Sequence, residues 1–441
     1  MHYGVNYTPS HGWFFTWLNP DWASVEKDFE QIASLGLDHV RIFPLWPLLQ
    51  PNRAYINEKA VSDVAQMVHL AGLHGLNVYV DVIQGHLSSY DFVPTWLVSW
   101  HDTNMFTDEK AIQAQAHLVK TVYEACEKEK NFSGLTLGNE CNQFTDISHP
   151  HRHPATAGQI QNWLEALLSP MEKKAHEQGR ILVHSENDAV WYEENHAFTP
   201  RFAAQLGDIT TVHSWVFNGV AKKYGPLSFE STNHARYLMD LALAYSDNPQ
   251  RQVWLQEAGS PLNVMTAGQA PEFCSQTVRA ALSHPQAYGV TWWCSHDVSS
   301  QMADFPNVEY SLGLFDEHGQ LKEVGKAYRD TIARCRDEFE YDESSKQNHD
   351  DHHSTTALVV PTRHGEPVMR AAQAAGGSVF TTWMNIAKQG EMPQIISSEK
   401  AHDARYCSSR GIHDLVEVQL EAGDAYEAVS DPSLAEKKSQ Q

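Results

Sequence analysis

The pattern that decides the fold lies in residues 59–82, which read KAVSDVAQMVHLAGLHGLNVYVDV. Lys59–Leu73 carries apolar residues at helical spacing, and Gly75 follows at a position where a helix C-terminal cap is expected. Val78–Val82 is a short and mostly apolar run, which suits a strand buried on both faces. A helix that leads directly into such a strand is typical of proteins built on a parallel sheet.

The same kind of apolar run recurs through the first 300 residues, and helical periodicity returns in Ser24–Leu35 and Lys110–Cys126. The other runs are Tyr3–Tyr7, His39–Phe43, Gly134–Gly138, Ile181–His184, Ile209–Val212, Val253–Gln256 and Gly289–Trp293. Strands that alternate with helices form parallel sheets with right-handed crossovers, and eight such units in about 330 residues fit a (β/α)8 barrel. The sequence therefore predicts an α/β fold, a TIM barrel.

A doubly wound sheet is the alternative for alternating strands and helices. Such a sheet usually carries a glycine-rich phosphate turn after its first strand. Here the first strand runs into Asn6-Tyr7-Thr8-Pro9-Ser10, which has no such turn. The barrel is the better prediction.

The composition changes after the barrel, so we divide the chain into four parts. We expect a catalytic barrel at 1–336, a polar linker at 337–355, a small β-containing C-terminal domain at 356–430 and a frayed tail at 431–441. The strands expected in the small domain are Thr356–Pro361, Ser378–Met384 and Leu415–Leu420.

Charge and cysteine content limit the ligands and the cellular compartment that we expect. The formal net charge is −23, which disfavours binding to nucleic acid and to anionic membranes but does not disfavour binding to a neutral sugar. No stretch approaches the roughly 18 apolar residues of a membrane span, and no signal peptide is visible. The six scattered cysteines predict reduced thiols and a cytoplasmic protein. Whether the chain forms a homo-oligomer stays open.

Two glutamates stand where a barrel enzyme places its reactive groups. Glu140 ends the fourth predicted strand and Glu257 ends the seventh, and barrel active sites lie at the carboxyl ends of the strands. Retaining glycoside cleavage uses two carboxyl groups about 5 Å apart across the glycosidic bond. Either glutamate alone could be a solvated cap or a salt-bridge partner, but the pair predicts an acid/base and a nucleophile. A nearby Arg41 would favour ionised Glu257.

The motifs at the strand ends resemble those of clan A glycoside hydrolases over roughly residues 1–335. They are Tyr3-Gly4-Val5-Asn6, Arg41, Gly138-Asn139-Glu140, His213, Trp254-Leu255-Gln256-Glu257 and Trp292-Trp293. The closest resemblance is to glycoside hydrolase family 5 and, within it, to intracellular bacterial exo-β-mannosidases that cleave Man-β-1,4-GlcNAc, the core disaccharide of N-glycans.

The resemblance implies a role for each matching residue. Glu140 would protonate the glycosidic oxygen and then activate water, and Glu257 would form the glycosyl–enzyme ester. The substrate-binding residues would be Arg41, which holds Glu257, Asn139 at the sugar 2-hydroxyl, His86 and His213 beside the sugar, and Trp292 as the stacking platform. The chemistry needs no cofactor and no metal, and the expected ligand is a small oligosaccharide.

Three residues stay ambiguous at this point. Members of family 5 often carry His-x-Tyr after the sixth strand, whereas this chain has His213-Ser214-Trp215, so Trp215 either donates to Glu257 or lines the sugar pocket. Glu186 and Asp297 are either substrate ligands or salt-bridged loop residues. The sugar is also open among a β-mannosidase, a β-glucosidase, a β-galactosidase and an endo-β-1,4-mannanase, and a non-catalytic carbohydrate-binding barrel is the alternative outside enzymes.

Overall fold

The computed structural model describes residues 1–344 and 354–424. Its main sheet has eight strands in the order β7-β6-β3-β2-β1-β10-β9-β8, and every pair of neighbours is parallel. The strands are β1 (His2–Asn6), β2 (His39–Ile42), β3 (Asn77–Gln84), β6 (Phe132–Asn139), β7 (Ile181–Val183), β8 (Thr210–Ser214), β9 (Val253–Ala258) and β10 (Ala287–Trp292).

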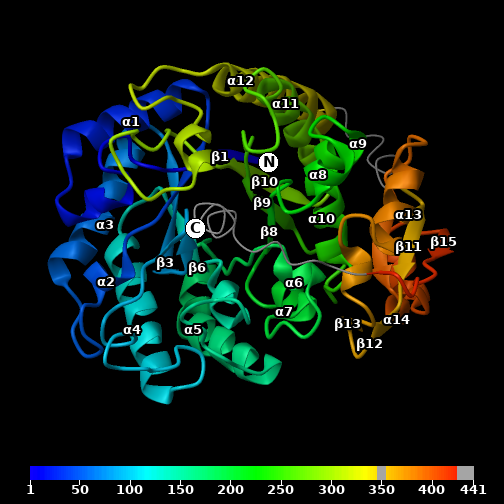
Figure 1. Ribbon diagram of the computed structural model, residues 1–441, viewed down its shortest axis with the longest axis horizontal. Coiled ribbons are helices and arrows are strands. Elements are labelled where there is room, and N and C mark those ends of the chain that lie inside the picture. The colour runs from blue at the N-terminus through cyan, green and yellow to red at the C-terminus, as the bar shows by residue number, and fades with distance from the viewer. Residues whose placement is uncertain (345–353, 425–441) are drawn as a thin grey trace, which may run out of the picture.

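Hydrogen bonds also connect the two ends of this order. The Thr211 hydroxyl donates to the carbonyl of His184 over 2.8 Å, and the backbone N–H of Asp208 donates to the carbonyl of Leu182 over 2.9 Å. The strands thus surround a common centre with helices outside them (Figure 1). This arrangement confirms the predicted (β/α)8 barrel.

Helices cover the outside of the barrel, and those predicted at Ser24–Leu35, Lys59–Leu73 and Lys110–Cys126 begin and end within two residues of the predicted positions. The covering helices are α1 (Trp22–Ser34), α3 (Glu58–Leu73), α4 (Glu109–Cys126), α5 (Ala157–Glu177), α7 (Pro200–Gln205), α10 (His234–Leu243), α11 (Ala270–Leu282) and α12 (Glu323–Ser344). Side chains of Asp21, Asn57, Asp108 and Thr156 cap the first turns of α1, α3, α4 and α5. Gly36 and Gly75 follow α1 and α3 with φ angles of 74° and 75°, and Gly75 thus has the conformation predicted for a C-terminal cap.

The amino end of the barrel is filled by large side chains. The rings of Tyr79 and Trp254 lie 4.7 Å apart between centroids. The hydroxyl of Thr291 accepts a hydrogen bond from the Trp254 indole over 2.8 Å and lies 2.7 Å from Nε2 of His39. Because this layer closes one end, a ligand can reach the barrel centre only from the carboxyl ends of the strands.

Short elements lie in the loops after the strands. They are η1 (Trp13–Leu18), α2 (Trp46–Leu49), β4 (His86–Leu87), β5 (Tyr90–Asp91), η2 (Cys141–Thr145), α6 (Ala189–Tyr192), α8 (Val220–Tyr224), α9 (Phe229–Thr232) and η3 (Asn307–Ser311). Within the described ranges, the chain has no helix that is both long and apolar enough to span a membrane.

The C-terminal part, residues 354–424, forms a second sheet beside the barrel, next to α10 (Figure 1). Its strands lie parallel in the order β14-β11-β15, with bounds Gln394–Ser397, Thr356–Val360 and Asp414–Glu417. The remaining elements are β12 (Thr362–Arg363), β13 (Glu366–Pro367), η4 (Ala371–Gln373), α13 (Ser378–Ala387), α14 (Ser398–Ala401) and α15 (Ala404–Ser409).

Two predictions for the chain after residue 336 were wrong. Ser378–Met384 belongs to helix α13 and is not a strand, because its buried residues Val379, Phe380, Trp383 and Met384 follow a helical period. The polar segment from residue 337 is helical as far as Ser344, where α12 ends. The frayed tail predicted at 431–441 lies outside the described residues.

Candidate active site

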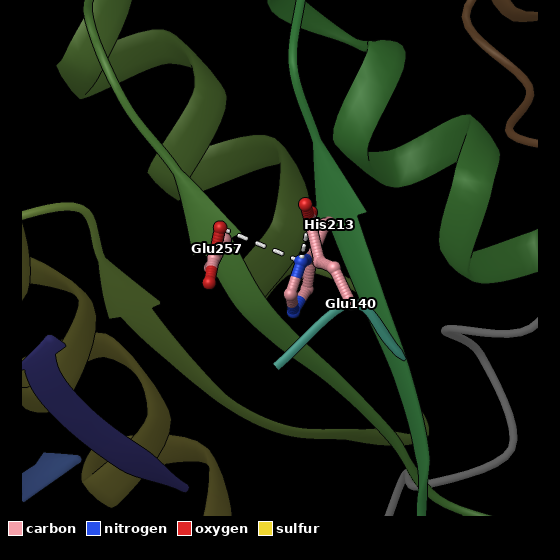
Figure 2. Close-up of side chains that lie close together, drawn as sticks. All are labelled: Glu140, His213 and Glu257. Carbon is pink, nitrogen blue, oxygen red and sulfur yellow. Dashed lines mark hydrogen bonds and ion pairs between the residues drawn. The ribbon is translucent and has the colours of Figure 1, made fainter. Parts of the chain in front are cut away.

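The carboxyl ends of β6 and β9 bring Glu140 and Glu257 face to face (Figure 2). One oxygen of each carboxylate and one ring nitrogen of His213 all lie within 4.8 Å of one another. Just below them, the Gln256 side chain of β9 donates to the Thr136 hydroxyl of β6 over 3.2 Å and links the two strands. A separation near 5 Å is the spacing of a retaining carboxylate pair, whereas an inverting pair stands about 6.5–9.5 Å apart.

Each oxygen of Glu257 receives its own hydrogen bond. Nη1 of Arg41 donates to Oε1 over 3.0 Å, and the indole N–H of Trp215 donates to Oε2 over 3.3 Å. The residue is only 3% exposed, so these donors substitute for solvent. Donors on both oxygens orient the carboxylate and favour its ionised form.

Arg41 is itself held on every side by residues from the strand ends. Its Nε donates to Asp81 over 2.9 Å, and a second bond from Nη2 reaches the same oxygen. Nη2 also donates to Asn139 over 2.7 Å, and Nη1 donates to Asn6 over 3.2 Å. Since Arg41 is fully buried, this fixed guanidinium positions Glu257 as well as neutralising it.

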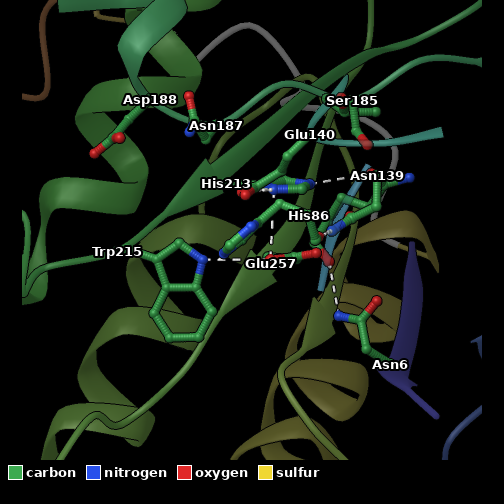
Figure 3. A network of polar contacts seen from close by, with 12 residues as sticks. Asn6, His86, Asn139, Glu140, Ser185, Asn187, Asp188, His213, Trp215 and Glu257 are labelled. Atoms are coloured by element: carbon green, nitrogen blue, oxygen red, sulfur yellow. Dashed lines mark hydrogen bonds and ion pairs between the residues drawn. The ribbon is translucent and has the colours of Figure 1, made fainter. Parts of the chain in front are cut away.

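Glu140 is held in a different way, by the loop that it opens. Its φ angle is 48°, in the left-handed region, and its N–H donates to the carbonyl of Ser185 over 3.1 Å. The Gln143 amide donates to Oε2 over 2.6 Å. Nδ1 of His213 lies 2.7 Å from Oε1. This turn of the backbone directs the carboxyl group back over the barrel centre (Figure 3).

His213 lies between the two carboxylates. Its Nδ1 is 3.4 Å from Oε2 of Glu257 as well as close to Glu140, and its Nε2 lies 3.3 Å from Oε1 of Gln256. Burial lowers the pKa of His213, but the negative charges of Glu257 and Glu140 outweigh burial and raise it above the ordinary value. The two carboxylates thus favour the protonated form of the imidazole.

The two glutamates have pKa values shifted in opposite directions. Burial raises the pKa of Glu257, the charge of Glu140 adds to that effect, and His213 and Arg41 only partly oppose it. Burial also acts to raise the pKa of Glu140, but the hydrogen bond and charge of His213 bring it below the ordinary value. The imidazole that lowers the pKa of Glu140 thus lies within hydrogen-bond distance of it.

His86 and Asn139 lie beside this group (Figure 3). The Asn139 amide donates to the carbonyl of His86 over 2.6 Å while its oxygen accepts from Arg41. The His86 ring lies 3.3 Å from Asp91, on the β4–β5 hairpin. Asp91 in turn lies 3.1 Å from Nε2 of His149 and joins the hairpin to the loop after β6.

Solved structures with the same architecture identify the family. A GH5_18 variant from Bifidobacterium longum subsp. longum in complex with Manβ1-4GlcNAc is 48% identical, with a TM-score of 0.91 over 98% of this chain and 100% of that one. A GH5_18 protein from Streptomyces cattleya in complex with GlcNAc is 44% identical, with a TM-score of 0.89 over 94% and 98% of the two chains. This chain belongs to glycoside hydrolase family 5, subfamily 18.

More distant matches are shorter or less similar. An exo-β-1,4-mannosidase from an Opitutaceae bacterium shares 19% identity and a TM-score of 0.73 over 90% of this chain and 69% of that one, which is a likeness of fold. A glucan 1,3-β-glucosidase from Blumeria graminis is 36% identical over 110 residues, 23% of this chain and 26% of that protein. No model of a protein family matches the sequence.

For this subfamily 18 hydrolase, the prediction that Trp292 is the stacking platform is wrong. Side chains alternate along a strand, and Thr291 points to the barrel interior, so Trp292 points outward. Trp292 is fully buried, with its ring 5.6 Å from that of Tyr328 in α12. The next residue, Trp293, lies 5.6 Å from Phe43, whose ring is beneath the guanidinium of Arg41.

In this hydrolase Glu186 and Asp297 each pair with a side chain of the protein. Glu186 is 3% exposed and lies 2.6 Å from Nδ1 of His184. Asp297 accepts two hydrogen bonds from Lys322, over 2.8 and 2.9 Å, and one from the backbone of Gly313 over 2.7 Å. Both carboxylates are thus bound by side chains of the protein itself.

Sequence reasoning missed two residues that contact the catalytic machinery. Asp81 binds Arg41 from the middle of β3, and Gln143 binds Glu140 from η2. Asp81 had a usable signal, because an aspartate inside the apolar run Val78–Val82 must be buried and therefore paired. Gln143 had no such signal, since one amide in a polar loop is unremarkable until the backbone turn at Glu140 is known.

Proposed function

We propose that the chain is a retaining exo-β-mannosidase that hydrolyses Man-β-1,4-GlcNAc to mannose and N-acetylglucosamine. The observation that carries this proposal is the likeness, at 43–48% identity and over almost the whole chain, to GH5_18 structures that hold this disaccharide. The close carboxylate pair supports a retaining mechanism, because it leaves room for a glycosyl ester and not for an intervening water.

In the first step Glu257 attacks the anomeric carbon of the mannose. The glycosidic bond breaks, its electron pair goes to the leaving oxygen, and Glu140 donates a proton to that oxygen. N-acetylglucosamine departs and mannose stays as an ester of Glu257. In the second step Glu140 removes a proton from water, the water oxygen attacks the same carbon, and the ester breaks to return both carboxyl groups to their starting states.

Arg41 and Trp215 act on the nucleophile in this scheme. Their bonds to Oε1 and Oε2 keep Glu257 aligned for attack and favour its ionised form. When the ester forms, the carboxylate loses its charge, and the fixed network of Asp81 and Asn139 prevents Arg41 from moving away. Trp215 thus donates to the nucleophile from the position at which other family 5 members often carry a tyrosine.

His213 supplies the proton that Glu140 must give. The neighbouring carboxylates raise the pKa of His213, which favours its protonated form, and Nδ1 lies 2.7 Å from Oε1 of Glu140. When a bound sugar brings the glycosidic oxygen to Glu140, transfer of the proton from His213 to Glu140 prepares the acid. Glu140 is then protonated when the bond breaks.

Other residues fix the sugar. Asn139 binds the 2-hydroxyl, His86 and His213 line the mannose site, and Trp293 replaces Trp292 as the stacking platform. Trp293 is the better candidate because it follows an inward-facing residue by two positions and lies beside Phe43, close to Arg41.

The test compares three substrates: Man-β-1,4-GlcNAc, mannobiose and polymeric mannan. We expect mannose release from the disaccharide with the highest kcat/KM and no mixed oligomers from the polymer. Oligomers cut from the interior of mannan would indicate an endo-mannanase. Faster hydrolysis of aryl β-glucosides or β-galactosides than of aryl β-mannosides would assign a different sugar to the same mechanism.

We also propose that the enzyme acts in the cytoplasm, late in the breakdown of N-glycans. The six cysteines are all free thiols, and five of them are buried, as in proteins from reducing compartments. The disaccharide would arrive after larger glycans had been trimmed elsewhere. Activity assays on separated cytoplasmic and external fractions test this placement, and activity confined to the external fraction would contradict it.

A further inference from the structure

The C-terminal part of the chain holds a loop of the barrel through one buried arginine. Arg370 is 8% exposed, and its Nη1 points into the loop after α6. The two N–H groups of that nitrogen are shared among the carbonyls of Glu193, His196 and Phe198, which lie 3.2, 3.2 and 3.1 Å away. One guanidinium nitrogen from residues 354–424 thereby fixes the backbone of the 193–198 loop.

The residues after Arg370 extend this attachment. Gln373 donates from Nε2 to the carbonyl of Trp191 over 2.5 Å, and the N–H of Ala371 donates to Glu194 over 3.1 Å. The Tyr237 hydroxyl of α10 donates to the carbonyl of Gln373 over 2.7 Å. The last carbonyls of a helix lack partners inside it, and here the C-terminal part supplies donors for those at the end of α6.

The other end of α6 lies at the active site (Figure 3). Asp188 precedes the helix and accepts from Asn218, over 3.2 and 3.3 Å, beyond Trp215. Asn187 and Asn142 bind each other twice, over 2.7 and 3.1 Å, and Asn142 lies two residues after Glu140. α6 has four residues, too few to keep its place without partners at both ends.

We propose that Arg370 and Gln373 are positioning residues for the acid/base Glu140. They hold the carboxyl end of α6, and the first N–H of α6 donates to the Asn187 side chain. Asn187 in turn binds the side chain of Asn142 in the loop that Glu140 opens, while the Ser185 carbonyl accepts from the N–H of Glu140 itself. Glu257 is oriented separately, by Arg41 from β2 and Trp215 from the loop after β8. The C-terminal part therefore acts on proton transfer and not on nucleophilic attack. This inference rests on the proposed function.

The experiment compares two substrates that differ in their need for an acid. Dinitrophenol leaves a β-mannoside without protonation, whereas N-acetylglucosamine must be protonated to leave. For Arg370→Met we expect kcat on Man-β-1,4-GlcNAc to fall between about tenfold and a hundredfold, since a small displacement of a catalytic group has effects of that size. We expect kcat on 2,4-dinitrophenyl β-mannoside to fall less than about threefold.

Three variants separate positioning from simple loss of stability. Arg370→Lys should recover most of the activity, because an ammonium group has three donors for the three carbonyls. Lys400→Met is the matched control, since Lys400 also ties the C-terminal part to barrel carbonyls, those of Ala244 and Ser246. It should lower Tm comparably and leave the ratio of the two kcat values unchanged. If Arg370→Met does not fold, the two kcat values are compared in Gln373→Glu, which replaces one donor at constant shape.

Equal losses on both substrates, in either Arg370→Met or Gln373→Glu, would overturn the proposal, as would a changed ratio in Lys400→Met. A wild-type enzyme without activity on Man-β-1,4-GlcNAc would instead refute the proposed function. In that case the ratio is measured with methyl and dinitrophenyl glycosides of the sugar that the enzyme does cleave, so the two failures remain distinguishable.

Discussion

Two glutamates of equal chemistry lie at the carboxyl ends of β6 and β9, and their surroundings differ. Glu140 leaves its strand in a left-handed turn and takes its partners from loops, namely Gln143 and the Ser185 carbonyl. Glu257 stays within β9 and takes its partners from side chains, Arg41 and Trp215. The first arrangement places neutral groups and one imidazole around the carboxyl, and the second places a permanent cation beside it.

The difference matches what each step of the proposed reaction demands. An acid/base must gain and lose a proton in every turnover, so a titratable neighbour such as His213 suits it and a fixed cation would not. A nucleophile must stay ionised until it attacks, so a buried guanidinium that cannot lose its proton suits it. The two carboxylates are therefore suited to different roles because their partners differ, although the residue type is the same.

Removing the nucleophile should have the largest effect. Glu257→Gln keeps the shape and the hydrogen bonds to Arg41 but cannot form the ester, so we expect kcat to fall by about ten-thousandfold or more on every substrate. The measurement is mannose release from the disaccharide and dinitrophenol release from the aryl mannoside. Hydrolysis at the wild-type rate would refute the mechanism and favour the alternative of a non-catalytic sugar-binding barrel.

Removing the acid/base should have a smaller and more selective effect. For Glu140→Ala we expect kcat on Man-β-1,4-GlcNAc to fall about a thousandfold, since proton donation contributes that much. On dinitrophenyl β-mannoside the glycosyl ester should form readily and accumulate, because only the water step then lacks its base. Added azide should restore turnover and yield β-mannosyl azide. A product with inverted configuration would contradict the assignment of Glu140 and Glu257.

The sequence predicts the fold and the reactive pair for a common reason. Apolar strand runs and helical periodicity are local patterns, so the alternation that makes a barrel is visible without coordinates. The barrel then places the ends of all strands on one rim, which makes Glu140 and Glu257 neighbours although 117 residues separate them. Arg41 and His213 follow from the same rule, since each lies at or near a strand end.

What the sequence does not predict depends on side-chain direction and on long-range pairing. Trp292 and Trp293 are adjacent aromatic residues, and only the inward position of Thr291 shows which of them can face the sugar. Glu186 and Asp297 are equally plausible as ligands until His184 and Lys322 are seen beside them. The helix at Ser378–Ala387 was missed because a run of apolar and β-branched residues fits both secondary structures.

Changing His213 should shift the pH dependence of both glutamates at once. Its positive charge lowers the pKa of Glu140 and opposes the raised pKa of Glu257. In His213→Gln both pKa values should therefore rise, so ionisation of the nucleophile and deprotonation of the acid both occur at higher pH. We expect the bell-shaped profile of kcat/KM to move to higher pH on both limbs. At the original optimum the loss should be about tenfold to a hundredfold, as for a charge-assisted hydrogen bond.

The control for this variant is His184→Gln, which removes a buried imidazole that pairs with Glu186 instead. It should leave both limbs of the profile in place. A profile of His213→Gln that keeps its acidic limb, or moves it to lower pH, would mean that His213 carries no charge in the empty site. The proton would then have to reach Glu140 from another source.

The smallest effect is expected at Trp215, and it tests how much the second donor on Glu257 adds to the first. Trp215→Phe keeps the stacked contact with Phe217, at 5.1 Å between centroids, but removes the N–H that reaches Oε2 over 3.3 Å. Because that bond is long and Arg41 remains, kcat should fall less than about tenfold. The acidic limb should move to higher pH, since a donor that favours the ionised carboxylate is lost.

Phe217→Leu, which weakens the stacking and keeps the donor, should leave that limb unchanged. A loss in Trp215→Phe as large as that of Glu140→Ala would mean that the indole, more than the guanidinium, holds the nucleophile.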